Sequence, residues 1–439
     1  MMVCSFRGVV ASLALLPAIG VAQQAAGSGR QIAIDEAVRL AIQNQPATVQ
    51  ARNALRTGSS SVRLNLMQML PNLNLNYSAG QQGGTQFIQG TPVPISGLPW
   101  TYTRGISTGM TLFDGGRNWY NYKSAESTLD ASDATEVSQR YSIALLVKTQ
   151  YYNVLAAREQ EAAAQRQLEQ NQQQLTVSAA KMAAGAATRA DSLSAAIGVG
   201  TARLAILTAR NNLANANAAL TRFVASPVTV TALASDTADM ARVDIDESTL
   251  SQMVLEGPAV KQAAAALVAA KATHKSATTP YYPTVSAAAS YGQNPKATQG
   301  FEWGGGPTTT STRLTFTAAY PLFNNYSREN SLIIARVAED NAGVSLRDAK
   351  FGAQQNLTSF LSNYQTAQQS IELNQLQIVS ALENLRVVTQ QYNLGTKQLL
   401  DVLTAQASLD LARSNLISAR LNARVAKANI EALIGRDIK

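Results

Sequence analysis

The strongest constraint on how this chain can fold is an internal repeat with a fixed spacing. Gly185 and Asp191 return as Gly395 and Asp401, and the separation is the same for both pairs (395 − 185 = 210; 401 − 191 = 210). The offset persists without a gap through the long segments on either side of each glycine. A duplication without gaps places the same element at the same point of each half. The chain is therefore expected to fold as two copies of one unit.

Each of these glycines lies between two long segments with a helical pattern of apolar residues. Glycine adopts a positive φ at low cost, so it ends a helix readily. Thr396, directly after Gly395, is then expected to cap the helix that follows. Gly185, Gly395 and Thr396 are thus predicted to form the tips of two helical hairpins. The helix over residues 116–184 would be about 100 Å long at a rise of about 1.5 Å per residue.

The segment after each glycine carries an apolar residue at every seventh position. The positions are Val199, Ile206, Leu213 and Leu220 in the first copy, and Leu409, Leu416, Ala423 and Ile430 in the second. A sustained seven-residue repeat is typical of helices that pack side by side in a supercoil. The long helices are therefore expected to pack as coiled-coil-like pairs.

Each copy also contains two stretches in which apolar and polar residues alternate. Alternation with a period of two is typical of strands that have one apolar and one polar face. The apolar rows include Leu73, Leu75, Ile106, Val285 and Phe316, and the polar rows include Asn74, Ser107, Ser286 and Thr315. We predict that the apolar set faces lipid and that the polar set faces a water-filled lumen.

The segments that connect the strands of each pair are expected to be loops. Residues 83–100 are rich in Gly and Pro, and residues 294–310 contain three consecutive glycines. Aromatic residues lie near the strand ends, at Trp100, Tyr102, Tyr291 and Trp303. Such residues are typical of the aromatic girdle at a membrane interface, and packing beneath the loops is the alternative.

The number of strands bears on the oligomeric state. Four strands cannot close into a barrel, because even small barrels take about eight. An open sheet edge is not tolerated in lipid. Three chains would supply twelve strands, an even number that is compatible with an outer-membrane barrel. The strands therefore predict a homo-oligomer, and a homotrimer is the simplest solution.

The N-terminal segment is predicted to be a secretory signal peptide. It combines the basic Arg7 with an apolar run over residues 9–19 and the small-residue cleavage site Gly20-Val21-Ala22. The only cysteine, Cys4, belongs to this segment, so the mature chain is expected to have no disulfide. No apolar run long enough for a transmembrane helix is expected after it, so a membrane span would have to consist of strands. The predicted divisions are a signal peptide over 1–22, a first repeat over 23–225, a linker over 226–248 and a second repeat over 249–439.

The composition argues against several classes of function. Lys and Arg number 36 against 28 Asp and Glu, and the basic residues form no cluster with aromatic ones, so nucleic-acid binding is not expected. No nucleophile with its base, paired carboxylates or phosphate-binding loop is recognisable, so neither an enzyme nor a cofactor is expected. His274, the only histidine, has no Cys, His or acidic partner at ligand spacing, which argues against a metal site.

Several segments resemble the TolC-type outer membrane efflux proteins. They are Ile34-Asp35-Glu36-Ala37-Val38, Leu112-Phe113-Asp114-Gly115-Gly116, Leu322-Phe323-Asn324-Asn325 and Gly395-Thr396-Lys397-Gln398-Leu399-Leu400-Asp401-Val402-Leu403. The resemblance covers nearly the whole chain after the signal peptide, including the duplication. It implies an α+β membrane protein whose long helical hairpins form a periplasmic α-barrel. Four strands per chain would contribute to a trimeric, twelve-stranded β-barrel in the outer membrane.

The resemblance also implies a function and a site. The function is that of an exit duct for efflux or type I secretion, working with a periplasmic adaptor and an inner-membrane efflux pump or ABC transporter. The site is a gate at the hairpin tips. Tyr392 and Lys397 match linking residues on the second tip, and Asp191 matches their acidic partner on the first. Asp401 matches a pore aspartate, and Thr404 stands where a second one would lie.

Three alternatives remain open at this point. Tyr392 could simply pack at the neck of its hairpin. Thr188-Arg189-Ala190-Asp191 fits a capping box, so Asp191 and Asp401 could simply stabilise the start of a helix. For the whole chain, the competing class is a periplasmic helical-hairpin adaptor or structural coiled-coil protein without a membrane barrel. The four alternating strands discriminate between the classes, because an adaptor has no need for an apolar row that faces lipid.

Overall fold

The computed structural model describes residues 29–81, 84–95, 100–233, 246–295 and 308–438. The predicted signal peptide, with Cys4, and Trp303 lie outside these residues. Four long helices dominate the fold: α3 (Arg117–Ala183), α4 (Arg189–Val224), α7 (Ser327–Asn393) and α8 (Leu399–Ile434). The helices α3 and α7 have 67 residues each, and α4 and α8 have 36 each. Every boundary in the second pair lies 210 residues after its counterpart in the first, so the duplication predicted from the sequence is confirmed.

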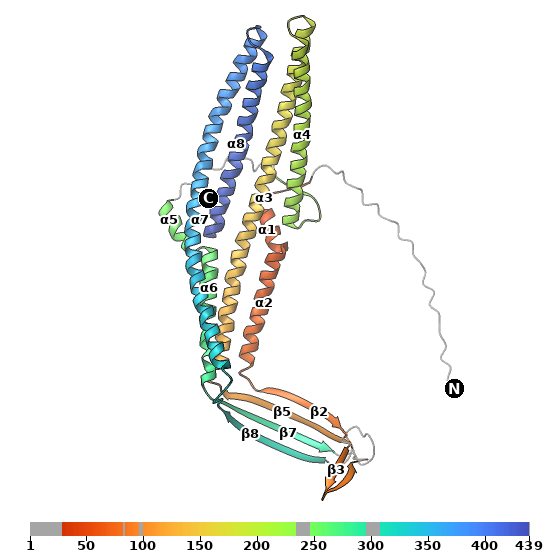
Figure 1. Ribbon diagram of the computed structural model, residues 1–439, viewed down its shortest axis with the longest axis vertical. Helices are drawn as coiled ribbons and strands as arrows, with labels where there is room; N and C mark the ends of the chain where they lie inside the picture. Colours follow the sequence, from red (N-terminus) through yellow and green to blue (C-terminus); the bar gives the residue numbers. More distant parts are fainter. Residues whose placement is uncertain (1–28, 82–83, 96–99, 234–245, 296–307, 439) are drawn as a thin grey trace, which may run out of the picture.

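The long helices pair as two antiparallel hairpins, α3–α4 and α7–α8, whose tips lie at the same end of the molecule (Figure 1). Shorter helices pack along the other half of α3 and α7. These are α1 (Ile34–Asn44), α2 (Pro46–Met67), α5 (Glu247–Leu255) and α6 (Pro258–Ala277), followed by a 3₁₀ turn at Thr279–Tyr281. Proline occupies the first turn of α2 and of α6, where its missing N–H leaves no helical bond unmade.

A four-stranded antiparallel sheet lies at the end opposite the tips. Its strands are β2 (Asn72–Gly80), β5 (Thr101–Phe113), β7 (Thr284–Pro295) and β8 (Thr308–Ala319), in the order β2-β5-β7-β8. The two pairs, one from each copy, join through β5 and β7. The sheet therefore has two outer strands, β2 and β8, each of which is paired on one side only among the described residues.

The register sorts the strand residues onto two faces. Leu75 lies opposite Ile106, and Ile106 lies opposite Tyr291. Because directly opposed residues share a face and alternate residues return to it, the pairing fixes the face of every residue in the sheet. One face carries Leu73, Leu75, Ile106, Val285 and Phe316, and the other carries Asn74, Ser107, Ser286 and Thr315. Contact of the apolar face with lipid stays a prediction.

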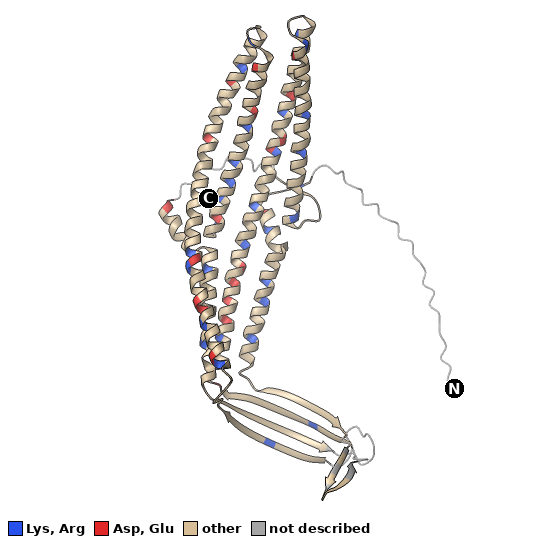
Figure 2. Ribbon diagram, in the orientation of Figure 1, with Lys and Arg blue, Asp and Glu red and all other residues tan. Residues whose placement is uncertain are grey.

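The strands are almost free of charge, as Figure 2 shows. Arg104 and Arg313 are the only charged residues in β2, β5, β7 and β8. Arg104 lies on the apolar face, toward the end of the sheet far from the helices, and its Nε donates to Gln293 Oε1 at 2.9 Å. Arg313 lies on the polar face. An apolar face of this length, with a single charged residue near one end, is costly to expose to water, so it requires a cover.

The prediction of an irregular loop over residues 83–100 was wrong. Two further strands, β3 (Gly84–Ile88) and β4 (Thr91–Ile95), form a separate antiparallel hairpin there. The two turn residues, Gln89 and Gly90, both have positive φ (51° and 83°), as a tight hairpin turn requires. Sequence rules assign the prolines in β4 to a loop, because proline has no N–H to donate within a sheet. In a two-stranded hairpin, however, each strand has an open edge, and a missing N–H is tolerated there. Of the second predicted loop, residues 294–310, only the ends are described, and they extend β7 and β8.

The predicted aromatic girdle is only partly compatible with the structure. Tyr291 is half exposed, but Tyr102 is fully buried within the chain, as the alternative of packing under the loops predicts. A larger group of exposed aromatic residues lies at the junction of the sheet with the helices. Its members include Trp119, Tyr282, Tyr320, Phe323 and Tyr326. Sequence analysis missed this group, because its members are scattered between strand ends and helix starts.

Each copy has its own apolar core near the middle of the molecule. In the first, α1, α3 and α4 pack with a small parallel pair of strands, β1 (Arg30–Ile32) and β6 (Val230–Ala232). The hydroxyl of Tyr151 donates to Ile32 O (3.1 Å) and accepts from Leu233 N (3.0 Å), which ties both strands to α3. In the second, α5, α7 and α8 pack together. Strand β6 and the start of α5 lie within the range predicted as a linker.

The expectation that no helix would be apolar enough to cross a membrane was wrong. Two helical segments, Arg189–Val224 and Glu247–Tyr281, meet the requirement by length and composition. In the first segment the Leu, Ile and Val residues are separated by alanine, glycine and polar residues, and in the second many of the apolar residues are alanine, so neither shows a long run of large apolar residues. The first of these segments is α4, which pairs with α3 and carries Arg203, Arg210 and Arg222 along its length.

Candidate functional site

The two hairpin tips share one backbone conformation. Gly185 and Gly395 have φ of 71° and 78°, in the left-handed region. In both tips the next amide turns back to the preceding helix: Ala186 N donates to Lys181 O at 2.8 Å, and Thr396 N donates to Gln391 O at 3.0 Å. These bonds satisfy carbonyls that the helix end leaves free. Nothing lies within 4 Å of a Cβ built on either glycine, so the requirement for glycine is the φ and not the space.

Thr396 does not cap the helix that follows, contrary to the prediction. Its hydroxyl donates to Gln391 O at 3.0 Å and so closes the end of α7 instead. The N-cap of α8 is Gln398, whose backbone N–H donates to Asp401 Oδ2 at 3.1 Å. The duplication explains the difference, because the residue that corresponds to Gln398 is Thr188 (398 − 188 = 210), the N-cap of α4. Thr396 lies two residues before the N-cap position, so it does not cap α8.

Both tip aspartates take part in helix capping. Asp191 Oδ2 accepts from the backbone N–H of Thr188 at 3.0 Å and from its hydroxyl at 2.8 Å. The hydroxyl oxygen of Thr188 in turn accepts from Asp191 N at 3.2 Å, which completes a capping box. Asp401 occupies the same position in α8. Capping therefore accounts for one oxygen of each carboxylate and leaves the question of a pore role open to test.

The predicted link from the second tip to Asp191 is not made within one chain. Lys397 lies beside Asp401, with Nζ 3.7 Å from Oδ1, and both side chains are exposed. Thr404, where a second pore aspartate was expected, donates its hydroxyl to Leu400 O at 2.8 Å. Among the described residues no hydrogen bond or ion pair joins Asp191 to Tyr392 or to Lys397. The link expected from the family resemblance is not formed because Asp401, four residues after Lys397, offers the lysine a nearer partner.

Tyr392 lies in a small apolar cluster that joins the two tips. Its side chain is 7% exposed and packs with Leu399 and Val402 of its own hairpin and with Ala195 of the other. Leu175 of α3 packs against the same cluster. The Tyr392 hydroxyl is buried and has no hydrogen-bond partner among the described residues. All four long helices therefore meet around this ring.

Lys181 is the residue of the site that sequence analysis missed. It lies in the last turn of α3, and its ammonium donates to the backbone carbonyl of Tyr392 at 2.8 Å. The same nitrogen lies 3.8 Å from the centroid of the Tyr392 ring, a cation–π distance. One signal was available in the sequence: at the corresponding position of the second copy stands Gln391 (391 − 181 = 210), so the cation is a departure from the repeat.

Farther from the tips, charged side chains connect α3 of the first copy with the end of α8 in the second. Lys148 Nζ lies 2.6 Å from Glu431 Oε2 and 2.8 Å from Asp437 Oδ1. Burial lowers the pKa of Lys148, but the hydrogen bonds to Asp437 and Glu431 outweigh it, so the pKa is raised above its usual value. Glu159 lies within 4.0 Å of both Arg420 and Arg424. These contacts hold the two hairpins together by charge.

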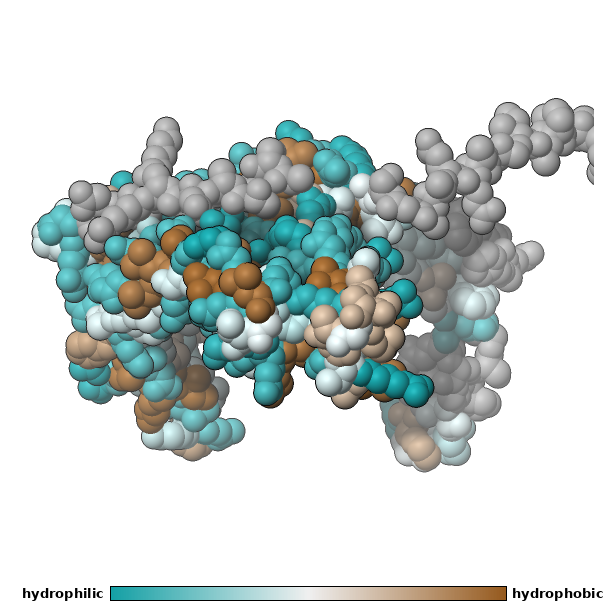
Figure 3. Space-filling view, turned by 90° about the horizontal axis from the view of Figure 1, so that it is seen from above, coloured by the Kyte–Doolittle hydropathy of each residue, from teal (hydrophilic) through white to brown (hydrophobic). Residues whose placement is uncertain are grey.

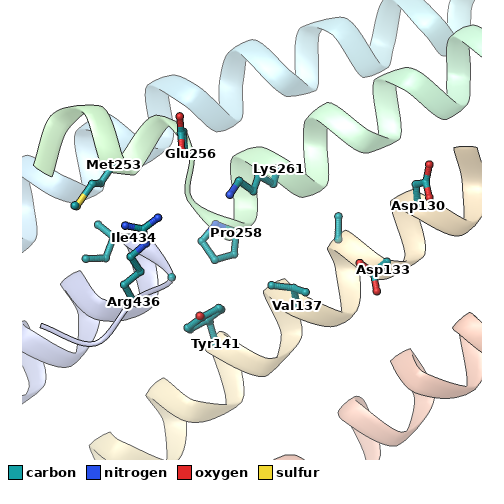
Figure 4. Close-up of a pocket in the computed structure, with 12 residues that line it drawn as sticks. Asp130, Asp133, Val137, Tyr141, Met253, Glu256, Pro258, Lys261, Ile434 and Arg436 are labelled. Atoms are coloured by element: carbon teal, nitrogen blue, oxygen red, sulfur yellow. The ribbon is translucent and has the colours of Figure 1, made fainter. Parts of the chain in front are cut away.

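A pocket of about 390 Å³ lies where α3 and the start of α6 meet the end of α8 (Figure 4). Figure 4 shows the Pro258 ring at the start of α6, with Tyr141 of α3 below it and Arg436 beside it. Gly435, with φ of 69°, ends α8 here, and a Cβ on it would lie 2.7 Å from Pro258 Cγ. This pocket is a structural joint between the copies. Among the described residues no group of three or more His, Cys, Asp or Glu could hold a metal ion.

The end of the molecule that carries the tips is shown in Figure 3. Its surface is largely hydrophilic, with apolar residues in scattered groups rather than in one continuous patch. Polar side chains at the tips therefore remain in water. The described part of the site contains helix caps, one ion pair and one cation–π contact, and this arrangement can hold the tips in one conformation.

Comparison with known proteins identifies the architecture. A family model described as outer membrane efflux protein matches residues 37–226 and 249–436. No curated protein sequence matches the chain. Several solved structures are similar over almost the whole chain. CusC has a TM-score of 0.80 at 19% identity, covering 93% of each chain. A membrane protein from Pseudomonas aeruginosa has a TM-score of 0.78 at 20% identity, covering 92% of this chain and 93% of that one.

The outer membrane channel MtrE of Neisseria gonorrhoeae, in its open state, has a TM-score of 0.77 at 20% identity. That match covers 92% of this chain and 89% of MtrE. At these identities the similar structures establish the fold. The family match covers both copies of the repeat and leaves out the region between them.

Proposed function

Because the chain belongs to the outer membrane efflux protein family, we propose that it forms a homotrimeric exit duct for efflux or type I secretion. The family places the protein in the outer membrane, with an extension into the periplasm, and makes it a channel rather than an enzyme. In the proposed assembly the duct works with a periplasmic adaptor and with an inner-membrane pump or ABC transporter. The similar proteins include CmeC of Campylobacter jejuni, which is described as an outer membrane channel.

The observation that carries this proposal is the open four-stranded sheet. Its strands have 9, 13, 12 and 12 residues, long enough to cross a bilayer at the usual tilt of about 45°. The two outer strands, β2 and β8, each lack a partner on one side among the described residues. In lipid these edges must be paired, and β8 of one protomer against β2 of the next is the pairing that repeats into a ring.

The helices support the same ring. Apolar side chains are exposed along α4, at Leu193, Ile197, Leu204 and Leu207, and along α7, at Leu373, Leu376 and Val379. In this half of the molecule the contacts run α4 to α3, α3 to α8 and α8 to α7, so α4 and α7 are the two outer helices. Two different outer surfaces of this kind fit a head-to-tail ring better than a twofold dimer. A periplasmic adaptor without a barrel would leave the apolar face of the sheet unexplained.

In the same proposal the tip stretch 391–404 is the gate of the duct. Asp401 would recur once per protomer around one axis, and such a ring favours cations over anions. Tyr392 and Lys397 would help to hold the resting state. Asp191, which caps the start of α4, is assigned to contacts with a neighbouring protomer, because no hydrogen bond or ion pair joins it to the second tip in the part of the chain that the structure describes. The description of MtrE as an open state fits a gate in channels of this fold.

The test of the ring is the mass of the cross-linked protein in mild detergent, together with a pair of arginine variants in the sheet. We expect a trimer. Leu75→Arg, on the apolar face, should cost about 2–4 kcal/mol and reduce the yield of trimer in the membrane. Asn74→Arg, next to it on the polar face, is the matched control and should cost far less. A stable monomer, or equal yields for the two variants, would reject the barrel.

A further inference from the structure

We propose that Lys181 is the latch that holds the two hairpin tips of each protomer together, and that its loss opens the gate. The proposal rests on the duct function proposed above. It adds a residue that lies outside the tip stretch 391–404 and that has no counterpart in the second copy of the repeat.

Two helix ends of the same polarity meet at this lysine. Both α3 and α7 run from the sheet toward the tips and end there, at Ala183 and Asn393. The C-terminal end of a helix carries about half a negative charge, so two such ends side by side repel each other. Lys181 belongs to the last turn of α3 and donates to Tyr392 O in the last turn of α7. One ammonium thus lies at both negative ends.

The carbonyl that Lys181 reaches is one of the last four of α7, which lack the regular partner four residues later that carbonyls in the helix interior have. It also accepts from Gly395 N at 3.1 Å, so the oxygen uses both lone pairs. A charge-assisted bond of this kind is stronger than a neutral one. The lysine therefore stabilises the end of the opposite hairpin as well as its own.

The ring of Tyr392 extends the contact to the other two helices. The ammonium lies 3.8 Å from the ring centroid, and the ring packs against Ala195 of α4 and Val402 of α8. Val402 is fully buried in this cluster. Separation of the tips would expose the ring and Val402 to water, so release of Lys181 and exposure of the cluster are coupled.

The charge of Lys181 is available for this role. No carboxylate lies within ion-pair distance of it among the described residues, whereas Lys397, the other lysine of the tips, pairs with Asp401, four residues farther along the same tip. The two halves of the latch also come from different copies. The position that corresponds to Tyr392 in the first copy is Met182 (392 − 182 = 210), so neither copy could form this contact with itself.

The experiment measures the tips in the assembled protein by two independent readouts. The first is the rate at which a maleimide labels Val402→Cys in the intact trimer. Parent protein without the substitution gives the background, since Cys4 lies in the predicted signal peptide. The second is single-channel conductance in planar bilayers. Both are compared for Lys181→Met, for Lys397→Met and for Arg189→Met, which removes an exposed cation at the same tips and serves as the control.

We expect Lys181→Met to raise the labelling rate by about tenfold, the effect of removing one charge-assisted hydrogen bond from a local opening equilibrium. Conductance should rise in parallel. Arg189→Met should change the labelling rate by less than about twofold, and Lys397→Met, which breaks an exposed ion pair, should raise it by less than Lys181→Met does. Lys181→Arg keeps the cation and should restore most of the protection. If Lys181→Met reduces the amount of trimer, Lys181→Gln provides the same comparison.

Two outcomes separate failure of the latch from failure of the duct. If the parent conducts and Lys181→Met labels and conducts as the parent does, the latch is refuted and the duct stands. If labelling rises in Lys181→Met but neither protein conducts, the latch holds and the proposed duct is refuted. A larger effect of Lys397→Met than of Lys181→Met would assign the closing contact to the second tip alone and would also overturn the proposal.

Discussion

The tips of the two hairpins have the same backbone but different side chains. Both turn at a glycine with φ near 75°, both close the preceding helix with the same hydrogen bond, and both start the next helix with a capping box. At corresponding positions, however, the first tip has Lys181 and Met182 where the second has Gln391 and Tyr392. The two tips thus share a duplicated backbone, whereas the contacts between them depend on the residues that diverged between the copies.

Repeated structure and diverged side chains are also found together near the middle of the molecule. Lys148 and Glu431, which join α3 to α8, correspond to Thr358 and Thr221 in the opposite copies (358 − 148 = 210; 431 − 221 = 210). Apolar positions behave differently, because Leu220 and its counterpart Ile430 are both buried. Packing within a copy is therefore repeated, whereas polar contacts between copies are formed once.

The largest effect is expected for the apolar core that both copies repeat. Leu220→Ala and Ile430→Ala each remove a buried side chain and leave a cavity, so each should cost about 2–5 kcal/mol. The thermal unfolding midpoint in detergent should fall by similar amounts for the two variants. Val228→Ala, at a position that is 54% exposed, is the control and should change little. A large effect in one copy only would show that the two cores are not equivalent.

A smaller effect is expected for the contact formed only once. Lys148→Met leaves Glu431 without its cation in a site where the Lys148 side chain is 15% exposed. Asp437, the second partner, is 83% exposed and adds little. The loss should be about 1–3 kcal/mol, between the values for exposed and buried pairs. Thr358→Met, at the corresponding exposed position, should cost less than about 0.5 kcal/mol.

The pH dependence of this pair has a definite sign. The pKa of Lys148 is raised in the folded protein, because its hydrogen bonds to Asp437 and Glu431 outweigh the effect of burial. A raised pKa of a base contributes stability that is fully present below the unfolded value of about 10.4 and is lost as the pH rises through the folded value. Thermal unfolding of the parent and of Lys148→Met should therefore converge above about pH 10.4. A constant difference across that range would contradict the role of this ion pair.

Much of the fold was predictable because it depends on repeated patterns. The period of 210 located both hairpins, and the alternation at Leu73, Leu75 and Ile106 gave the faces of the strands. The hairpin β3–β4 was missed because Gly and Pro are read as loop residues wherever they cluster. Strand β1 was missed because three residues are too few to show a period, and its partner β6 lies 200 positions away (230 − 30 = 200).

The site was less predictable than the fold. A resemblance transfers positions, and it pointed to Tyr392, Lys397 and Asp401 on the second tip. It could not indicate that Lys397 pairs with Asp401 of the same tip or that the partner of Tyr392 is Lys181. Which charged groups meet depends on the packing of two hairpins that are far apart in sequence. Pattern rules describe one element at a time and carry no information on that packing.

The smallest expected change in stability separates the two tip aspartates by function. Asp191→Ala and Asp401→Ala each remove one capping interaction and should each cost about 0.5–2 kcal/mol, visible as similar small falls in the unfolding midpoint. If Asp401 lines the pore, its loss should also weaken cation selectivity and block by divalent cations in planar bilayers, because three carboxylates leave one constriction. Asp191→Ala should leave selectivity unchanged, since its carboxylate is held by the backbone and hydroxyl of Thr188. Equal selectivity in both variants and in the parent would show that Asp401 only caps the helix. A change in Asp191→Ala alone would place the acidic constriction on the first tip.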